Sequence, residues 1–136
     1  MQFMIILKAT KDSEAGVPPS GDTIAKMIKF NEEMVKAGVL IDAGGLYPSS
    51  HGARVRFKGN KATVTDGPFT ETKELVAGYW LIKTKSKEEA IEWVKRVHGV
   101  WPEDTELEIR RAVEFETSPE IEEQAAKNRT QTAAAR

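Results

Sequence analysis

Two short runs in this sequence are apolar at every position, and they limit the folds that the chain can adopt. The first run is Phe3–Leu7 and the second is Tyr79–Ile82. A strand that is apolar on both faces is typical of the middle of a sheet that is covered on both sides. We therefore expect both runs to be central strands, with other parts of the protein packed against each of their faces.

Two helices are predicted, one after each of these two apolar runs. The first follows Ser20 or Asp22, either of which can cap it, and ends at Gly38, because glycine adopts the left-handed conformation of a helix end freely. The second begins at Ser86 and ends near Gly99. The expected buried stripes are Ile24, Met27, Ile28, Met34 and Val35 on the first helix, and Ala90, Ile91, Val94 and Val97 on the second.

A hairpin is predicted in the middle of the chain. Ala53–Lys58 and Lys61–Asp66 flank Gly59-Asn60, which is a two-residue turn signal. This register pairs Val55 with Val64 and Phe57 with Ala62 on one face, and it places Arg54, Arg56, Thr63 and Thr65 on the other.

The remaining elements are two strands and a tail. Val39–Leu46 is a strand interrupted by Gly44-Gly45, which indicates either a bulge or a close approach of another group to the backbone. Glu106–Glu116 alternates as a half-buried strand, with Phe115 among its apolar residues. From Ser118 the chain is polar and alanine-rich, which predicts a mobile tail or a loosely docked helix.

The order strand, helix, strand, hairpin, strand, helix, strand predicts an α+β fold. Without the hairpin it is the ferredoxin-like split βαβ plan, in which two helices cover one face of an antiparallel sheet. The other face would then expose the apolar residues of the central strands, and monomeric proteins rarely expose such a surface. We expect a homodimer whose sheets face each other, and the alternative is that the hairpin and tail cover this face within one chain.

Composition excludes several classes of protein. The 136 residues suit one domain, for which we expect residues 1–117, followed by a tail over residues 118–136. There is no cysteine, and 20 basic residues nearly balance 21 acidic ones, so thiol chemistry and nucleic-acid binding are not expected. No apolar stretch approaches the ~20 residues of a membrane span, and the start of the chain lacks a basic signal segment, which predicts a cytoplasmic protein.

The densest group of functional side chains is the segment Thr65–Glu74. Asp66 stands at a strand end before Gly67-Pro68, where a partly shielded carboxylate is a candidate general base or ligand anchor. The alternative is that Asp66 caps an Asx turn formed by the two residues that follow it.

Neighbouring residues are candidates for a supporting role. Arg54 and Arg56 can hold a carboxylate or phosphate, and His51 can carry a proton near neutral pH. The more ordinary alternatives are ion pairs for the arginines and a solvated ring for the histidine. We include Gly67, Phe69, Glu71 and Lys73 among the ligand-binding candidates. Neither histidine has neighbours spaced as metal ligands, and no phosphate-binding or dinucleotide motif occurs, so no metal or cofactor is expected.

The segment Thr65–Glu74, followed by Gly78-Tyr79-Trp80-Leu81, resembles the signature of the DGPF proteins within the YCII-related family. The resemblance extends from Met1 to about Phe115 and includes Ala53–Arg56 and Glu89–Trp93. It implies a dimeric α+β barrel of ferredoxin-like subunits. More distant members use a His–Asp pair in a cleft, and Asp66 corresponds to that aspartate. Phe30 and Asn31 occupy the region where the histidine is expected.

These observations predict a site for a small, anionic metabolite at the Asp66 loop. Asp66 and His51 would move protons there, and the arginines would hold the anion. The alternative is a non-catalytic module that binds a ligand or a protein partner in a regulatory role, in which Asp66 and Phe69 build the loop.

Overall fold

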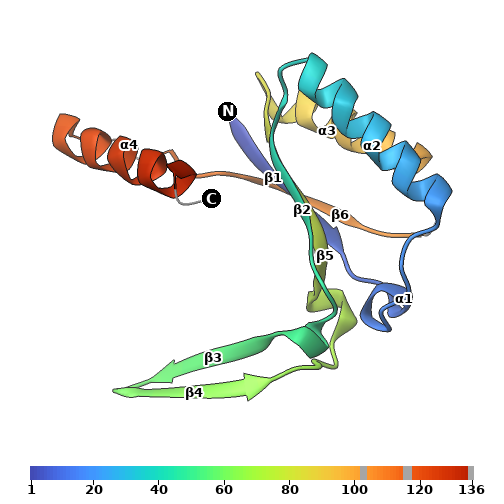
Figure 1. Ribbon diagram of the computed structural model, residues 1–136, viewed down its shortest axis with the longest axis horizontal. Coiled ribbons are helices and arrows are strands. Elements are labelled where there is room, and N and C mark those ends of the chain that lie inside the picture. Colours follow the sequence, from blue (N-terminus) through green and yellow to red (C-terminus); the bar gives the residue numbers. More distant parts are fainter. Residues whose placement is uncertain (102–103, 115–117, 135–136) are drawn as a thin grey trace.

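The computed structural model describes residues 1–101, 104–114 and 118–134. Figure 1 shows a body of sheet and helices from which a hairpin and the last helix project. The elements in chain order are β1 (Gln2–Lys8), α1 (Lys11–Glu14), α2 (Gly21–Lys36), β2 (Leu40–Gly45), η1 (Ser49–His51), β3 (Ala53–Lys58), β4 (Lys61–Asp66), η2 (Thr72–Glu74), β5 (Val76–Lys83), α3 (Lys87–Lys95), η3 (Arg96–Gly99), β6 (Leu107–Arg111) and α4 (Pro119–Ala134).

The body is a four-stranded sheet in the order β2-β5-β1-β6. Every neighbouring pair is antiparallel, and the two apolar strands β1 and β5 lie at the centre. Helices α2 and α3 lie on the same side of this sheet (Figure 1). The α+β class and the split βαβ plan with an inserted hairpin are therefore confirmed. Within the part of the chain that the structure describes, no helix combines the length and the apolar character that crossing a bilayer requires.

The side of the sheet that faces the helices carries the core. Phe3 and Ile5 of β1 are buried beside Trp80 and Ile82 of β5, because the register pairs Phe3 with Ile82 and Ile5 with Trp80. The ring of Phe30 on α2 meets the ring of Trp80 edge-on at 6.1 Å. This side is thus closed by α2 and α3.

The other side of the sheet, which we call the open face, has an apolar centre with charged borders. Met4 and Ile6 alternate with the core residues of β1, and Tyr79 and Leu81 are their register partners on β5. All four are only half-buried. We expected other parts of the protein to cover both faces of these strands. Within the described chain, the face toward α2 and α3 is covered, and the open face is not.

Helix α2 has two apolar stripes, and the sequence pattern selected the wrong one in part. Met34 is buried and Met27 is half-buried as expected, but Ile24, Ile28 and Val35 are exposed. The buried side is completed by Thr23 and Phe30, which stand at the helical spacing of Met27 and Met34. Both stripes have the same helical spacing, so the spacing alone could not predict which of them faces the core.

The ends of α2 follow the sequence signals. Ser20 is the N-cap, and its hydroxyl accepts a hydrogen bond from the backbone N–H of Thr23 at 3.2 Å. Gly38 has φ of +71°, and the N–H of Val39 bonds to the carbonyl of Met34 at 2.9 Å. This is the Schellman arrangement, and it places buried Val39 at the start of the chain leading into β2.

The hairpin β3–β4 has the expected register. Val55 pairs with Val64 and Phe57 with Ala62, and Arg54 and Arg56 pair with Thr65 and Thr63 on the opposite face. Every residue of both strands is exposed. The hairpin projects away from the body (Figure 1), so it does not cover the open face of its own chain.

Three further expectations have mixed outcomes. The paired glycines of β2 are not a bulge, because the irregularity lies between Leu40 and Asp42, but a side chain does approach them closely. A Cβ at Gly44 would lie 3.0 Å from the ring of Tyr79.

Strand β6 ends at Arg111 instead of Glu116, and Phe115 lies outside the described residues. The tail forms the helix α4, which extends away from the sheet (Figure 1).

Candidate functional site

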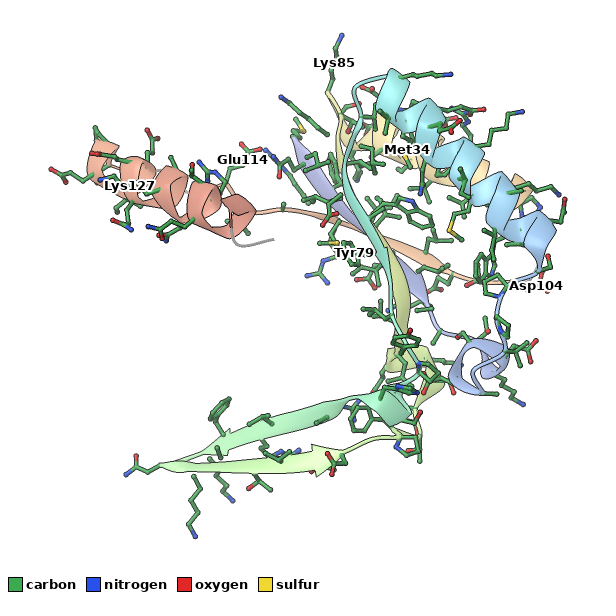
Figure 2. The ribbon with its side chains drawn as sticks, in the orientation of Figure 1. Met34, Tyr79, Lys85, Asp104, Glu114 and Lys127 are labelled. Carbon is green, nitrogen blue, oxygen red and sulfur yellow. The ribbon has the colours of Figure 1, made fainter. Side chains whose placement is uncertain are left out.

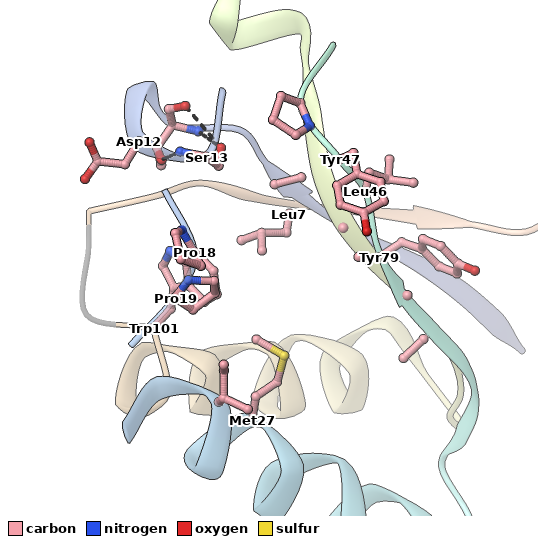
Figure 3. Close-up of a pocket in the computed structure, with 18 of the residues that line it drawn as sticks. Leu7, Asp12, Ser13, Pro18, Pro19, Met27, Leu46, Tyr47, Tyr79 and Trp101 are labelled. Carbon is pink, nitrogen blue, oxygen red and sulfur yellow. Dashed lines mark hydrogen bonds between the residues drawn. The ribbon is translucent and has the colours of Figure 1, made fainter. Parts of the chain in front are cut away.

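A cavity of about 590 Å³ lies between the sheet and the first half of α2. Figure 3 shows Leu7 and Met27 extending into the space between the sheet and the helices, with Pro18 and Pro19 of the preceding segment at its side. Most of its walls are apolar, and their large apolar or aromatic side chains include Leu7, Met27, Leu46, Tyr47, Trp80 and Trp101. This volume matches the clefts that hold small molecules.

Two side chains with N–H donors are among the residues that line the cavity, Asn31 and Trp101. The indole N–H of Trp101 is fully buried, has no hydrogen-bond partner among the described residues and does not open into the cavity. Asn31 accepts a hydrogen bond from the indole N–H of Trp80 at 2.9 Å through Oδ1, so its amide NH₂ is the donor that remains for a ligand.

A single helical turn forms the outer wall of the cavity. The sequence pattern predicts a loop here, but Thr10 and Ser13 cap the short helix α1 reciprocally. The N–H of Ser13 bonds to the Thr10 hydroxyl at 3.1 Å, and the N–H of Thr10 bonds to the Ser13 hydroxyl at 2.8 Å (Figure 3). Asp12 on this turn is the only charged residue among those that line the cavity in the described chain.

The turn η1 joins the cavity wall to the predicted Asp66 loop. Glu14 accepts hydrogen bonds from both the N–H and the hydroxyl of Ser49, and the hydroxyl of Ser49 also accepts one from the N–H of Phe69 at 3.0 Å. Tyr47 and Pro48, which precede Ser49, line the cavity. The Asp66 loop is therefore connected to the cavity through Ser49 and is not itself part of the wall.

Asp66 occupies the last position of β4, opposite Ala53. Its side chain is exposed, which differs from the expected partial shielding. Among the described residues its carboxylate has no hydrogen-bond partner, so the Asx turn that was the alternative is not formed either. The adjacent Gly67 is the tightly packed residue, because a Cβ there would lie 1.8 Å from the carbonyl oxygen of Ser49.

The two arginines have different environments. The guanidinium of Arg54 lies 3.9 Å above the centre of the Phe69 ring, a cation–π contact that holds the start of the hairpin against the loop. Arg56 lies further along the hairpin and is exposed. The two arginines, which we expected to hold an anion, therefore have separate surroundings, and the guanidinium of Arg54 contacts an aromatic ring.

His51 stacks on the ring of Tyr47, with centroids 5.1 Å apart and an angle of 17° between the planes. Tyr47 lines the cavity, so His51 contacts a residue of the cavity wall without being part of that wall. Glu71 and Lys73 are exposed beside the turn η2. None of the eight candidates lines the cavity; they are His51, Arg54, Arg56, Asp66, Gly67, Phe69, Glu71 and Lys73.

Charge clusters elsewhere do not form a second centre in the described part of the chain. On the open face, Glu108 lies 3.2 Å from Arg110 and 3.5 Å from Lys8. The hydrogen bond from Arg110, together with the charge of Lys8, lowers the pKa of Glu108 from its ordinary value. No group of three or more His, Asp or Glu residues that could hold a metal ion occurs among the described residues.

Comparison with known proteins agrees with this architecture. Residues 1–116 match the YCII-related domain. The chain belongs to the YCII-related family. A similar protein, Uncharacterized protein R00369 of Rhizobium meliloti (strain 1021), is 34% identical over 76 residues, which are 56% of this chain and 61% of that protein. The chain thus aligns with less than two thirds of the relative's length.

A solved structure with a similar arrangement is 5-chloro-2-hydroxyhydroquinone dehydrochlorinase from Burkholderia phenoliruptrix, in complex with 2,5-dihydroxybenzoquinone. The alignment covers 85% of this chain and 96% of that chain, with 15% sequence identity and a TM-score of 0.46.

Proposed function

We propose that this YCII-related protein is a homodimer that binds an uncharged, largely apolar small molecule in the cavity between α2 and the sheet. The observation that carries the proposal is a largely apolar cavity of about 590 Å³ whose lining includes Trp80, Trp101 and the polar side chain of Asn31. Cavities of this size with a few polar groups are the usual form of small-molecule sites.

The charge of the lining revises the expected class of ligand. Among the described residues, the walls contain no lysine, arginine or histidine, and their one charged residue is acidic Asp12. An anion placed there would lose its hydration and gain no cationic partner, which is costly. The proposed ligand is therefore uncharged, whereas the arginines of the hairpin predicted an anionic metabolite.

Asn31 defines the polar part of that ligand. Its Oδ1 is engaged by Trp80, so its NH₂ is the group left for a ligand, and a carbonyl or ether oxygen suits it better than a hydroxyl that must itself donate. One such hydrogen bond contributes about 1 kcal/mol to affinity when the alternative is a buried donor without an acceptor.

The open face supports the dimer. Met4, Ile6, Tyr79 and Leu81 form its apolar centre, and none of the helices and strands that the structure describes packs over this face (Figure 1). Two copies that pack face to face would remove both apolar centres from water, with sheets about 10 Å apart.

A pair of probes tests the ligand class. Acetylnaphthalene carries a carbonyl oxygen, and ethylnaphthalene has nearly the same shape without it. We expect Asn31→Leu to weaken binding of acetylnaphthalene by about 5-fold to 10-fold and not to weaken binding of ethylnaphthalene, because leucine is close to asparagine in size and lacks the amide donor. Titration followed by protein NMR measures both affinities.

Matched variants locate the site. Trp93→Phe changes a tryptophan that packs against Phe30 and does not line the cavity, so both affinities should be unchanged. Met27→Trp should abolish binding of both probes by filling the space. Binding that survives Met27→Trp but is lost in Arg56→Ala would contradict the proposal and place the ligand at the hairpin.

Proton transfer by Asp66 and His51 stays a prediction. The observation in its favour is the stacking of His51 on Tyr47, which connects that ring to the cavity wall. If the site is catalytic in this way, Asp66→Asn will keep probe binding and abolish turnover of a substrate found by screening. If Asp66→Asn leaves turnover intact, the loop is a non-catalytic part of the binding module. The cytoplasmic location also stays a prediction.

A further inference from the structure

The hairpin has an apolar face that no described part of its own chain covers. Val55, Phe57 and Val64 are 51%, 79% and 63% exposed, and they lie on one side because the register pairs Val55 with Val64. The extensive contacts of β3 and β4 are with each other. A hairpin of two strands is marginally stable in water, so this face needs a partner surface.

A matching surface lies on the outer side of α2. Ile24, Ile28 and Val35 are 44%, 56% and 61% exposed, and with Asn31 they form a continuous stripe, which we call the outer stripe. Ile28, Asn31 and Val35 border a shallow hollow on this side, together with Glu32 and Lys36. Ile24 and Asn31 also line the cavity, so whatever covers the outer stripe also closes that side of the cavity.

The length of the hairpin determines what it can reach in a dimer. Its strands have 6 residues each, which gives an arm of about 20 Å. The arm projects on the side of the sheet opposite α2 and α3 (Figures 1 and 2). If two open faces pack about 10 Å apart, an arm of that length passes the partner's sheet and lies beside its edge and its helices.

The two edges of the sheet differ in character. The β2 edge adjoins exposed Ile41, Leu46 and Tyr47, and it lies on the cavity side. The β6 edge carries Glu108, Arg110 and Arg111. An apolar hairpin face therefore suits the β2 and α2 side of a second copy.

The hairpin is basic, and the helix that we compare it with has no net charge. Residues 53–66 hold four basic residues and one acidic residue, whereas α2 holds three of each. Charge therefore does not oppose a contact between the hairpin and α2, and the apolar surfaces are what favour it.

We infer that the apolar face of the hairpin of one protomer packs on the outer stripe of α2 of its partner and closes the side of the partner's cavity at Ile24 and Asn31. The inference rests on the proposed dimer. It adds that each ligand site is completed by the other chain.

Because the chain has no cysteine, disulfide cross-linking tests this contact directly. A chain with Phe57→Cys is co-expressed with a differently tagged chain with Ile28→Cys, and the pair is oxidised. We expect a disulfide between the two tags. Val113→Cys, which is 74% exposed on the chain beyond β6, replaces Ile28→Cys as the matched control and should give no such product.

The outcomes separate the two proposals. A monomer in light scattering, with no cross-link, would overturn both the dimer and the inference. A dimer in which Phe57→Cys joins Leu81→Cys on the open face, and not Ile28→Cys, would overturn the inference alone. Tight binding of a labelled DNA duplex that Arg56→Glu abolishes would assign the hairpin to nucleic acid and would overturn it as well.

Discussion

The helix-covered face of the sheet and the hairpin are built from similar alternating strands, but the apolar side chains are buried on the first and exposed on the second. Phe3, Ile5 and Ile82 on the covered face are almost completely buried, whereas Val55, Phe57 and Val64 on the hairpin are largely exposed. The difference is not in the strands themselves, since both sets alternate with polar or half-buried neighbours. It arises from what lies opposite each face, which is α2 and α3 in one case and nothing from the same chain in the other.

This comparison teaches that an apolar strand face specifies that a partner exists and does not specify which chain supplies it. The hairpin and the open face satisfy the same physical requirement as the core only if a partner surface covers them, and a second copy supplies that surface in the proposed dimer. Variants on the two regions should therefore respond differently to protein concentration.

Phe3→Ala should have the largest effect. It removes a fully buried aromatic ring from the covered face and should lower the free energy of unfolding by about 3–5 kcal/mol. Phe57→Ala is the matched control on the hairpin. In dilute, dissociated protein it should change the free energy of unfolding by less than about 0.5 kcal/mol. Urea unfolding followed by circular dichroism measures both, and similar losses in the two variants would break the comparison.

Gly67→Ala should have the next largest effect, because it acts where the hairpin joins the body. The added Cβ would lie 1.8 Å from the carbonyl oxygen of Ser49, so backbone must shift. We expect a loss of about 1–3 kcal/mol in the free energy of unfolding. Gly45→Ala is its control, since a Cβ there meets nothing within 4 Å. Equal stability of the two variants would mean that the contact at Gly67 is not rigid.

Ser49→Ala should cost somewhat less, about 1–2 kcal/mol. The variant removes the hydroxyl that donates to Glu14 and accepts from the N–H of Phe69, in a half-buried place. Amide hydrogen exchange should rise at Phe69, whose N–H loses its acceptor. The neighbouring Ser50→Ala is the control, and it should leave exchange at Phe69 unchanged.

The smallest effect concerns pH on the open face. The hydrogen bond from Arg110 and the charge of Lys8 hold the pKa of Glu108 below its ordinary value of 4.5. The ionised carboxylate therefore stabilises the folded chain above that value, and this contribution is lost as the pH falls through the lowered pKa. Arg110→Ala should move the pKa of Glu108 upward in an NMR titration of its side-chain carboxyl carbon. An unchanged titration would remove Arg110 from the explanation.

Sequence patterns predicted the fold well because its signals are local. The capping serine at Ser20, the left-handed Gly38 and the Gly59-Asn60 turn each act within a few residues, and each was found where expected. The stripe on α2 was partly wrong because a helix with two apolar stripes offers the core a choice that only the packing of Phe30 against Trp80 decides.

The candidate site was harder to predict because its walls come from distant parts of the chain. Met27, Leu46 and Trp101 carry no chemical motif, and they meet only through the order of the strands. The conspicuous segment around Asp66 supports the cavity through Ser49 instead of lining it. The signal that could have indicated the cavity was Asn31, a polar residue at a half-buried position of α2.

Sedimentation velocity at micromolar concentration tests the central claim most directly, because a second copy covers both the open face and the hairpin in the proposed dimer. We predict a single species of twice the 15.1 kDa chain mass for the wild-type protein, and partial dissociation in Leu81→Asp, which charges the open face. A stable species of 15.1 kDa for the wild-type protein at that concentration would contradict the account.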